Sequence, residues 1–327
     1  MPGSSRWLLC ASLLLSGARS AWGTRDHDRI PTMVRVMSRG QAQHARGHGG
    51  IRPGARASSW GQVGLAAAPG RARTWQQLWA SPVWQGVKVI YACPQEGKEV
   101  VYLTFDDGPN HDFPEFAARL RSLNVSATFF WVAANVEFQE HRDAGRAASL
   151  QSGLRWHAVG SHSFGHADLT KKDVDRAKEI GEAHRLLTDV HCGVDVTLFR
   201  PPFGSHDSDL LDYFEGHGYH YGVALWDIDT LDWDDVAVPD EAALFANINR
   251  TWGGAGGGKA GHIILMHEGK NKANNLENIA HVVDHIKGLC RACSFESLDS
   301  CPLLHDGAGG PVRDCPPGPD PADPGPE

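Results

Sequence analysis

Two adjacent aspartates, Asp106 and Asp107, follow the apolar run Val100–Phe105 and can place two carboxylates in one site. Neighbouring residues of a strand point to opposite faces, so we expect the backbone to turn at Gly108-Pro109 and bring both side chains together. If one carboxylate binds a metal ion and the other meets an arginine, both stay ionised, and the second can act as a base. The alternative is structural, because Asp-Gly-Pro is also common in ordinary turns.

Two histidines, His162 and His166, follow a second apolar run, His157–Ser161. Their spacing of four suits two ligands of one ion on a helical turn or in a tight loop. The chain contains 18 histidines, so a surface or core role is the competing interpretation of this pair. Two histidines and one carboxylate with open coordination positions would be typical of a catalytic metal site rather than a structural one.

Three further apolar runs end in polar residues that can do chemistry. They lead to Arg200, to the pair Asp232-Trp233, and to His267. The prolines after Arg200, in Pro201–Gly204, restrict the backbone and remove two N–H donors. Each cluster alone also has a structural interpretation: a rigid turn, a polar group beside a core aromatic, or a buried histidine bonded to the backbone.

The elements that would position these residues are short buried strands, since runs rich in Val, Ile, Leu and Phe are typical of them. Parallel strands that each deliver a functional group from the same end are typical of a (β/α) barrel. A further strand is predicted at Ala127–Val132. Helices are predicted after a capping Asp112, at Lys171–Val190 and at Asn274–Leu289. This alternation favours the α/β class with a parallel sheet.

Taken together and in this order, the segments resemble the polysaccharide deacetylases of carbohydrate esterase family 4, the NodB-homology domain. The matching segments are Thr104–Pro109, His162–His166, Arg200–Phe203, Asp229–Trp233 and Leu265–His267. The resemblance extends over roughly 87–289. It implies a distorted (β/α) TIM-like barrel, a divalent metal that is usually zinc, and hydrolysis of N-acetyl groups on an N-acetylglucosamine polymer.

The resemblance also implies how the metal and the base are held. Asp107, His162 and His166 would be the metal ligands, and the metal would polarise the acetamide carbonyl and bind a water molecule. Asp106 would take a proton from that water as general base. Arg200 would keep Asp106 ionised and oriented.

The remaining implied roles concern the leaving group and the acetyl pocket. His267 would protonate the leaving amine as general acid, and Asp232 would pair with it and raise its pKa. The backbone N–H of Phe203 would help to stabilise the oxyanion. Trp233 and Leu265 would shape an apolar pocket for the acetyl methyl group.

Two segments depart from the family pattern without removing a catalytic position. Phe203 stands where Tyr is commoner, but the implied role uses the backbone of this residue. The segment Asn110–Pro114 stands where many relatives begin a helix with Thr-Pro, which alters a loop near the cleft.

Targeting and domain organisation follow from composition. The chain has 327 residues and a formal net charge of −8, which argues against general nucleic-acid binding. We predict a signal peptide at 1–23, a basic low-complexity linker at 24–86, a catalytic domain at 87–298 and a Pro/Gly-rich tail at 299–327. The basic segment can alternatively bind an anionic cell wall or act as a second targeting element. The apolar stretch Trp7–Leu15 is too short to span a bilayer, so no integral membrane span is expected.

Six cysteines remain after the predicted signal peptide, which suggests three disulfides of undetermined pairing. Cys290 and Cys293 can instead form half of a structural zinc site, but export favours disulfides. Asn124 and Asn249 begin candidate glycosylation motifs, which agrees with export.

The expected protein is therefore a secreted or cell-wall, monomeric, metal-dependent polysaccharide N-deacetylase with zinc or another divalent ion as cofactor. Chitin or chito-oligosaccharides are the expected substrates, with peptidoglycan or acetylated xylan as alternatives. Two other classes compete: a carbohydrate-binding pseudoenzyme, and a structural protein stapled by zinc at Cys290 and Cys293. Delivery to an organelle by bipartite targeting is the alternative to secretion.

Overall fold

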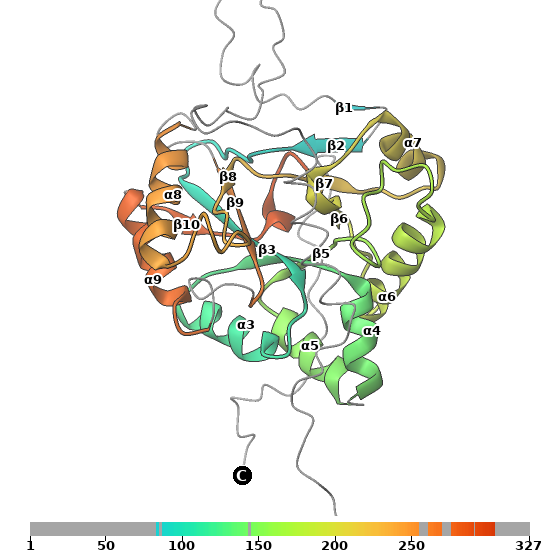
Figure 1. The fold of residues 1–327 in the computed structure, drawn as a ribbon, viewed down its shortest axis with the longest axis horizontal. Coiled ribbons are helices and arrows are strands. Elements are labelled where there is room, and N and C mark those ends of the chain that lie inside the picture. The colour runs from blue at the N-terminus through green and yellow to red at the C-terminus, as the bar shows by residue number, and fades with distance from the viewer. Residues whose placement is uncertain are drawn as a thin grey trace, which may run out of the picture. The chain divides into compact units, whose positions relative to one another are not determined.

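A ten-stranded, largely parallel sheet forms the centre of the described chain (Figure 1). The computed structural model describes residues 83–84, 87–142, 145–254, 261–269, 276–290 and 292–304. The strands are β1 (Val83–Trp84), β2 (Val87–Ile90), β3 (Val100–Gly108), β4 (Ala127–Trp131), β5 (Ala158–Ser161), β6 (Leu198–Phe199), β7 (Gly222–Ala224), β8 (Ile228–Asp229), β9 (His262–His267) and β10 (Ser294–Phe295). Their order is β1-β2-β7-β6-β5-β4-β3-β9-β8, and β10 pairs with β3. Among the described strand pairs, β1–β2 alone is antiparallel.

The strands near the two ends of the sheet order, β2 and β9, come together where the chain leaves β2. Ala92 forms an isolated antiparallel bridge with His262 at the start of β9. Next to it, the Cys93 N–H donates to the Gly261 carbonyl at 2.7 Å. Because this contact links the β2 side of the sheet to β9, the parallel strands curve into an incomplete barrel. The predicted fold class, an α/β protein with a distorted (β/α) barrel, is confirmed.

Helices surround the sheet (Figure 1). They are α3 (Phe113–Ser122), α4 (Ala133–Arg142), α5 (Arg146–Leu154), the π-helix η1 (Ala177–Glu182), α6 (Ala183–Val190), the 3-10 turn η2 (Pro202–Gly204), α7 (Ser208–Gly216), α8 (Glu241–Gly254), α9 (Ile279–Leu289) and the 3-10 turn η3 (Leu298–Ser300).

The helices predicted from the sequence are present, with shifted boundaries. The one expected from Lys171 begins at Ala177 as a π-helix and continues as α6, and the one expected from Asn274 begins at Ile279. Asp112 occupies the N-cap position of α3, but its side chain makes no capping hydrogen bond. The expected strand at Ala127–Val132 is β4.

An aromatic cluster packs α3 against the ends of β3 and β4. The Phe105 ring stacks on Phe129 at 5.2 Å, and the Phe113 ring meets Trp131 edge-on at 4.8 Å. All four side chains are fully buried. Aromatic side chains bury large apolar areas and pack in specific geometries, so this cluster holds rigid the two strand ends that carry the aspartates and Trp131.

The described cysteines are disulfide-bonded. Cys93 pairs with Cys301 and Cys290 pairs with Cys293, and Cys192 is disulfide-bonded as well. The disulfide interpretation of Cys290 and Cys293 is thus favoured over a zinc half-site.

Described structure continues slightly beyond the predicted catalytic domain, because η3 and Cys301 pack against it. The predicted signal peptide and the linker up to residue 82 lie outside the described residues, and so does the tail from 305 onward. In the described part of the chain, every helix is too short or too polar to cross a membrane.

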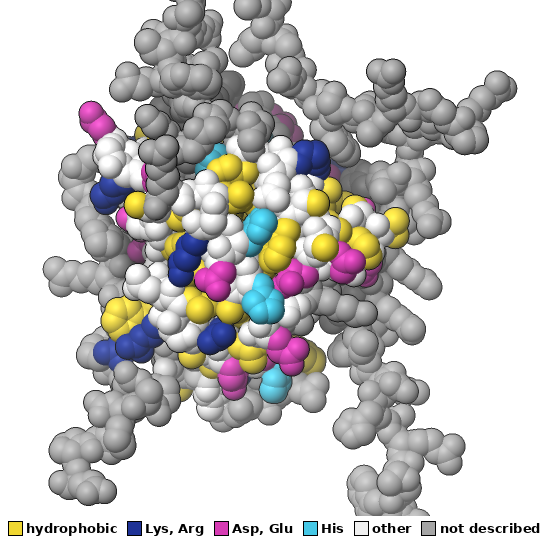
Figure 2. All heavy atoms as spheres, turned by 90° about the vertical axis from the view of Figure 1, so that its left-hand side faces the viewer, with side chains coloured by type: hydrophobic (Ala, Val, Ile, Leu, Met, Phe, Trp, Pro, Cys, Tyr) yellow, Lys and Arg dark blue, Asp and Glu magenta, His cyan; other side chains and the backbone are white. Residues whose placement is uncertain are grey.

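The face over α8 and α9 carries side chains of every type (Figure 2). Basic and acidic side chains both occur on it, with histidine and hydrophobic side chains between them. Such a mixture is the ordinary surface of a globular protein and does not form the basic stripe that nucleic-acid binding requires.

The barrel-closing contact predicts that alanine substitutions at Gly261 and Gly288 change the free energy of unfolding in opposite directions. A Cβ at Gly261 would lie 1.8 Å from the Cys93 carbonyl oxygen, whereas one at the exposed helical Gly288 would meet nothing within 4 Å. We expect Gly261→Ala to lower the free energy of unfolding by about 1–3 kcal/mol through overpacking. Gly288→Ala should raise it by about 0.5–1 kcal/mol because glycine disfavours helix interiors. Urea denaturation measures both, and equal stabilities would contradict the described closure.

Candidate active site

Asp106 and Asp107 reach one site because β3 contains a β-bulge. The register with β4 shifts between Asp106 and Gly108, and Asp107 has φ 69°, in the left-handed region. Bulges re-aim side chains in this way, and Asp is one of the few residue types that tolerates a left-handed backbone. The Asn135 amide holds the conformation by donating to the Asp107 carbonyl at 2.8 Å. The sequence prediction that the Gly108-Pro109 turn would bring the carboxylates together is therefore corrected: the rearrangement occurs at Asp107 itself.

Both carboxylates lie beside His162 at the end of β5. The His162 Nε2 atom is 3.7 Å from Asp106 Oδ2 and 3.6 Å from Asp107 Oδ1. His166 Nε2 lies 3.2 Å from the same Asp107 oxygen. Asp107, His162 and His166 thus form a group whose ligand atoms are all within 4.8 Å of one another and can hold a metal ion.

The two histidines are held in a loop rather than on a helix. His166 has φ 60°, and its backbone N–H donates to the Ser163 hydroxyl at 2.9 Å. The His162 Nδ1–H donates to the Arg200 carbonyl at 2.7 Å, which leaves the Nε2 lone pair directed at the aspartates. A second hydrogen bond of this kind is typical of metal-binding histidines, because it fixes the tautomer and the ring orientation. The donor set therefore fits a divalent metal.

Sequence reasoning missed Glu179, which shapes the histidine loop. The Gly165 N–H donates to Glu179 Oε2 and the Phe164 N–H to the Glu179 carbonyl, both at 2.8 Å. Glu179 lies in η1, and π-helical turns are frequent at functional sites. The only signal in the sequence was a carboxylate within a helical segment, which does not point to this role.

Arg200 is fully buried and binds Asp106 directly. Its Nη1 atom donates to Asp106 Oδ1 and to the Thr104 hydroxyl, each at 2.8 Å. Its other N–H groups donate to the carbonyls of Ala224 at 2.8 Å and Leu225 at 3.0 Å. Burial lowers the pKa of Arg200, and the charge of Asp106 opposes that shift. The arginine therefore orients the Asp106 carboxylate and faces it with a positive charge.

His267, at the end of β9, pairs with Asp232. The His267 Nδ1–H donates to Asp232 Oδ1, and the His267 backbone N–H donates to Asp232 Oδ2, both at 2.7 Å. Burial by itself lowers the pKa of His267, but the charge and hydrogen bond of Asp232, with Asp107 and Asp106, raise it to about 9. This histidine is therefore protonated at neutral pH.

The structure places Phe203, expected to bind the oxyanion, beside His166, and it places Trp233 and Leu265, expected to shape the acetyl pocket, next to Asp232 and His267 along the chain. Phe203 has φ 61° within η2, and its 41 % exposed side chain presents its ring 4.7 Å from the His166 ring. Trp233, 36 % exposed, directly follows Asp232. Leu265 is buried in β9, two residues before His267 and on the same face of the strand.

A second carboxylate that sequence reasoning missed, Glu268, directly follows His267 and is buried. Burial raises the pKa of Glu268 to about 8, although hydrogen bonds from Asn110 and Trp131 oppose the shift. Its position after the apolar run is visible in the sequence, but its partners come from β4 and from the loop after β3.

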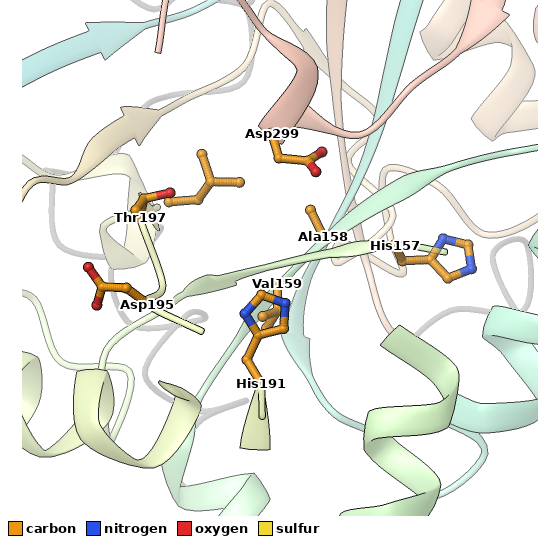
Figure 3. A pocket seen from close by; sticks show the side chains of 8 residues that line it. His157, Ala158, Val159, His191, Asp195, Thr197 and Asp299 are labelled. Carbon is orange, nitrogen blue, oxygen red and sulfur yellow. The ribbon is translucent and has the colours of Figure 1, made fainter. Parts of the chain in front are cut away.

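A separate hollow lies at the opposite ends of the strands, beside the first residues of β5 and β6 (Figure 3). Its space of about 20 Å³ is room for one water molecule. His157, which lines it, uses both ring nitrogens, accepting from Ala127 N–H at 3.1 Å and donating to the Ala117 carbonyl at 3.0 Å. The hollow therefore does not compete with the strand-end site as a catalytic centre.

Comparisons with known proteins agree with this fold. The profile described as polysaccharide deacetylase matches residues 94–222. A peptidoglycan-N-acetylglucosamine deacetylase of Bacillus cereus is 33 % identical over 199 residues, which are 59 % of this chain and 67 % of the relative. A chitooligosaccharide deacetylase of Sinorhizobium fredii is 30 % identical over 178 residues, covering 53 % of this chain and 74 % of the relative. The chain belongs to the polysaccharide deacetylase family, carbohydrate esterase family 4.

A solved structure shows the same fold. The crystal structure of a peptidoglycan N-acetylglucosamine deacetylase superposes with a TM-score of 0.52 at 22 % identity, covering 64 % of this chain and 91 % of that one. The barrel is therefore shared with a solved member of the family.

The Asp232–His267 pair predicts a displaced histidine titration. In metal-free protein, NMR titration of labelled histidines should give His267 a pKa of about 9, against the ordinary 6.5. Asp232→Asn should lower it, because the largest contribution that opposes the effect of burial is then removed. The pKa of His267 is higher in the folded protein than in the unfolded chain. The pair with Asp232 therefore contributes its full stability below about pH 6.5, and this contribution is lost as the pH rises through about 9.

His157 serves as the internal control for that titration, because burial lowers its pKa to about 4. Its signal should not respond to Asp232→Asn. A His267 pKa that the substitution leaves unchanged would contradict the pairing.

Proposed function

We propose that the chain is a secreted, zinc-dependent N-deacetylase of N-acetylglucosamine polymers, acting on chitin or chito-oligosaccharides. The observation that carries the proposal is the meeting of three functions at one end of the sheet. These are a possible metal-binding group, a carboxylate held by a buried arginine, and a histidine protonated at neutral pH. Amide hydrolysis needs all three, because the carbonyl must be polarised, the water activated and the amine protonated.

The proposed metal site is Asp107, His162 and His166. Two imidazole nitrogens and one carboxylate oxygen suit zinc, and a three-ligand set leaves room for substrate and water. A divalent metal bound there supplies a Lewis acid that polarises the acetamide carbonyl and lowers the pKa of water at the site.

Asp106 acts as the general base in this mechanism. Its carboxylate takes one proton from the attacking water while the water oxygen forms a bond to the acetyl carbon. Arg200 orients the carboxylate and faces it with a positive charge through the 2.8 Å contact. The backbone N–H of Phe203 donates to the oxyanion of the tetrahedral intermediate.

His267 acts as the general acid. Its Nε2–H gives a proton to the nitrogen as the C–N bond breaks, which releases acetate and a free amine on the sugar. Asp232 binds Nδ1, so we assign the transferred proton to Nε2. In the metal-free protein Asp232 raises the pKa of His267, which favours the protonated form that a general acid requires.

Substrate and location are proposed on indirect support. The named relatives act on peptidoglycan or on chito-oligosaccharides, and both polymers contain the same N-acetylglucosamine unit. Disulfides at Cys93–Cys301 and Cys290–Cys293 suit an oxidising compartment, which supports secretion. Together with the candidate glycosylation motifs they favour chitin over peptidoglycan.

Acetate release tests the proposal directly. Chitin oligomers, peptidoglycan fragments and acetylated xylan are each incubated with the full-length protein, with zinc or with a chelator. We expect zinc-dependent release from chitin oligomers, and a loss of about 10²–10⁴-fold in Asp106→Asn because the base is removed. Asp195→Asn is the matched control, since Asp195 is exposed and pairs with His184 rather than with the site. This variant should keep the wild-type rate.

Other outcomes reassign the function. Release from peptidoglycan alone would replace chitin as the substrate. No release from any polymer, by folded and zinc-loaded protein, would favour the carbohydrate-binding pseudoenzyme.

A further inference from the structure

Glu268 is a buried carboxylate that the proposed reaction does not use. Only 3 % of it is exposed, and it lies between β4 and the loop that follows β3. Its Oε1 atom accepts the Trp131 indole N–H at 2.8 Å, and its Oε2 atom accepts the Asn110 backbone N–H at 3.0 Å. One side chain thus connects the end of β4 to the loop after the two aspartates.

The carboxyl group also lies directly against the bulge. A Cβ at Gly108 would be 1.7 Å from Glu268 Oε1 and 2.2 Å from its carboxyl carbon, so Gly108 leaves the space that the carboxylate fills. The Glu268 backbone N–H donates to the Asp106 carbonyl at 3.0 Å. Glu268 therefore contacts the chain on both sides of Asp107.

Asp107 needs such support because its backbone is in an unusual conformation. A left-handed non-glycine residue costs of order 1–3 kcal/mol and persists only where its surroundings determine it. Asn135 holds the Asp107 carbonyl from α4, and Glu268 holds the following residues, Gly108 and Asn110. Burying a carboxyl group is costly in either protonation state, and a packed apolar side chain would avoid that cost, so packing alone does not explain a glutamate here.

We propose that Glu268 is a positioning residue for the metal site: it locks the bulge that aims Asp107 at His162 and His166. The inference rests on the proposed metal-dependent function. It assigns Glu268 no contact with substrate or metal. The competing explanation is a purely structural role, in which Glu268 stabilises the barrel without affecting metal affinity.

Zinc affinity of the metal-free protein separates the two explanations. Competition with a chromophoric chelator measures it without any reference to deacetylation. Glu268→Gln keeps the shape of the side chain. Its amide oxygen can accept only one of the two hydrogen bonds, so its amide NH2 group would face either the Trp131 N–H or the Asn110 N–H, donor against donor. We expect zinc affinity to fall about 10-fold, the lower end of the range for residues that support metal ligands.

Glu296→Gln is the matched control. Glu296 is a half-buried carboxylate that accepts hydrogen bonds from Gln95, Ser294 and Ser300, and its backbone N–H donates to the Val101 carbonyl near the start of β3. The substitution Glu296→Gln makes the same chemical change as Glu268→Gln, but beside the start of β3 rather than beside its end. Zinc affinity should therefore stay at the wild-type value in this variant, even where thermal stability falls.

Trp131→Phe provides a second test of the proposal, because it removes the indole N–H that Glu268 accepts and leaves Glu268 itself unchanged. Circular dichroism confirms folding of each variant. Weaker zinc binding by folded Glu268→Gln or Trp131→Phe supports the proposal. Wild-type affinity in both variants, with or without a lower melting temperature, overturns it and leaves the purely structural role. Wild-type protein that binds no zinc would instead overturn the proposed function, and this inference with it.

Discussion

The buried guanidinium of Arg200 is the interaction on which the site depends. A fully buried charge is tolerated only when its donors are satisfied and an opposite charge is near. Arg200 meets both conditions through Asp106, Thr104 and two carbonyls at the end of β7. The same residue receives the His162 Nδ1–H on its own carbonyl. Asp106 on β3 and His162, directly after β5, are thus both placed by Arg200, which directly follows β6. Because these partners come from separate strands, the site forms only when the sheet has closed around the arginine.

Asp106 and His267 lie opposite each other on the neighbouring strands β3 and β9, and each faces a buried partner of opposite charge. The Arg200 guanidinium contacts Asp106 at 2.8 Å, whereas Asp232 raises the pKa of His267. In the proposed reaction one of these groups accepts a proton and the other donates one, so the opposite charges of the two partners suit the two roles.

The sequence predicted the features that depend on neighbouring residues of the chain, and it did not predict those that depend on contacts between distant segments. The strand ends and the order of the motifs could be predicted, because apolar runs and the residues directly after them lie close together in the chain. The bulge at Asp107 could not, since it depends on the register with β4 and on Asn135 from a helix whose apolar pattern is weak. For the same reason Glu179 and Glu268 were missed: each acts on a loop that is distant in sequence. Helix α7 was missed although Asp207, its N-cap, was a visible signal.

The contact between Gly108 and Glu268 has a consequence for how this site can change over evolutionary time. The carboxylate occupies the volume that any side chain at 108 would need, so the two positions are not independent. A side chain at 108 would push the carboxylate away from the Trp131 indole and the Asn110 N–H, and a shortened residue 268 would leave the indole without its acceptor. A single replacement at either position therefore disturbs the same buried hydrogen bond. We expect positions 108, 131 and 268 to change together among descendants of this chain.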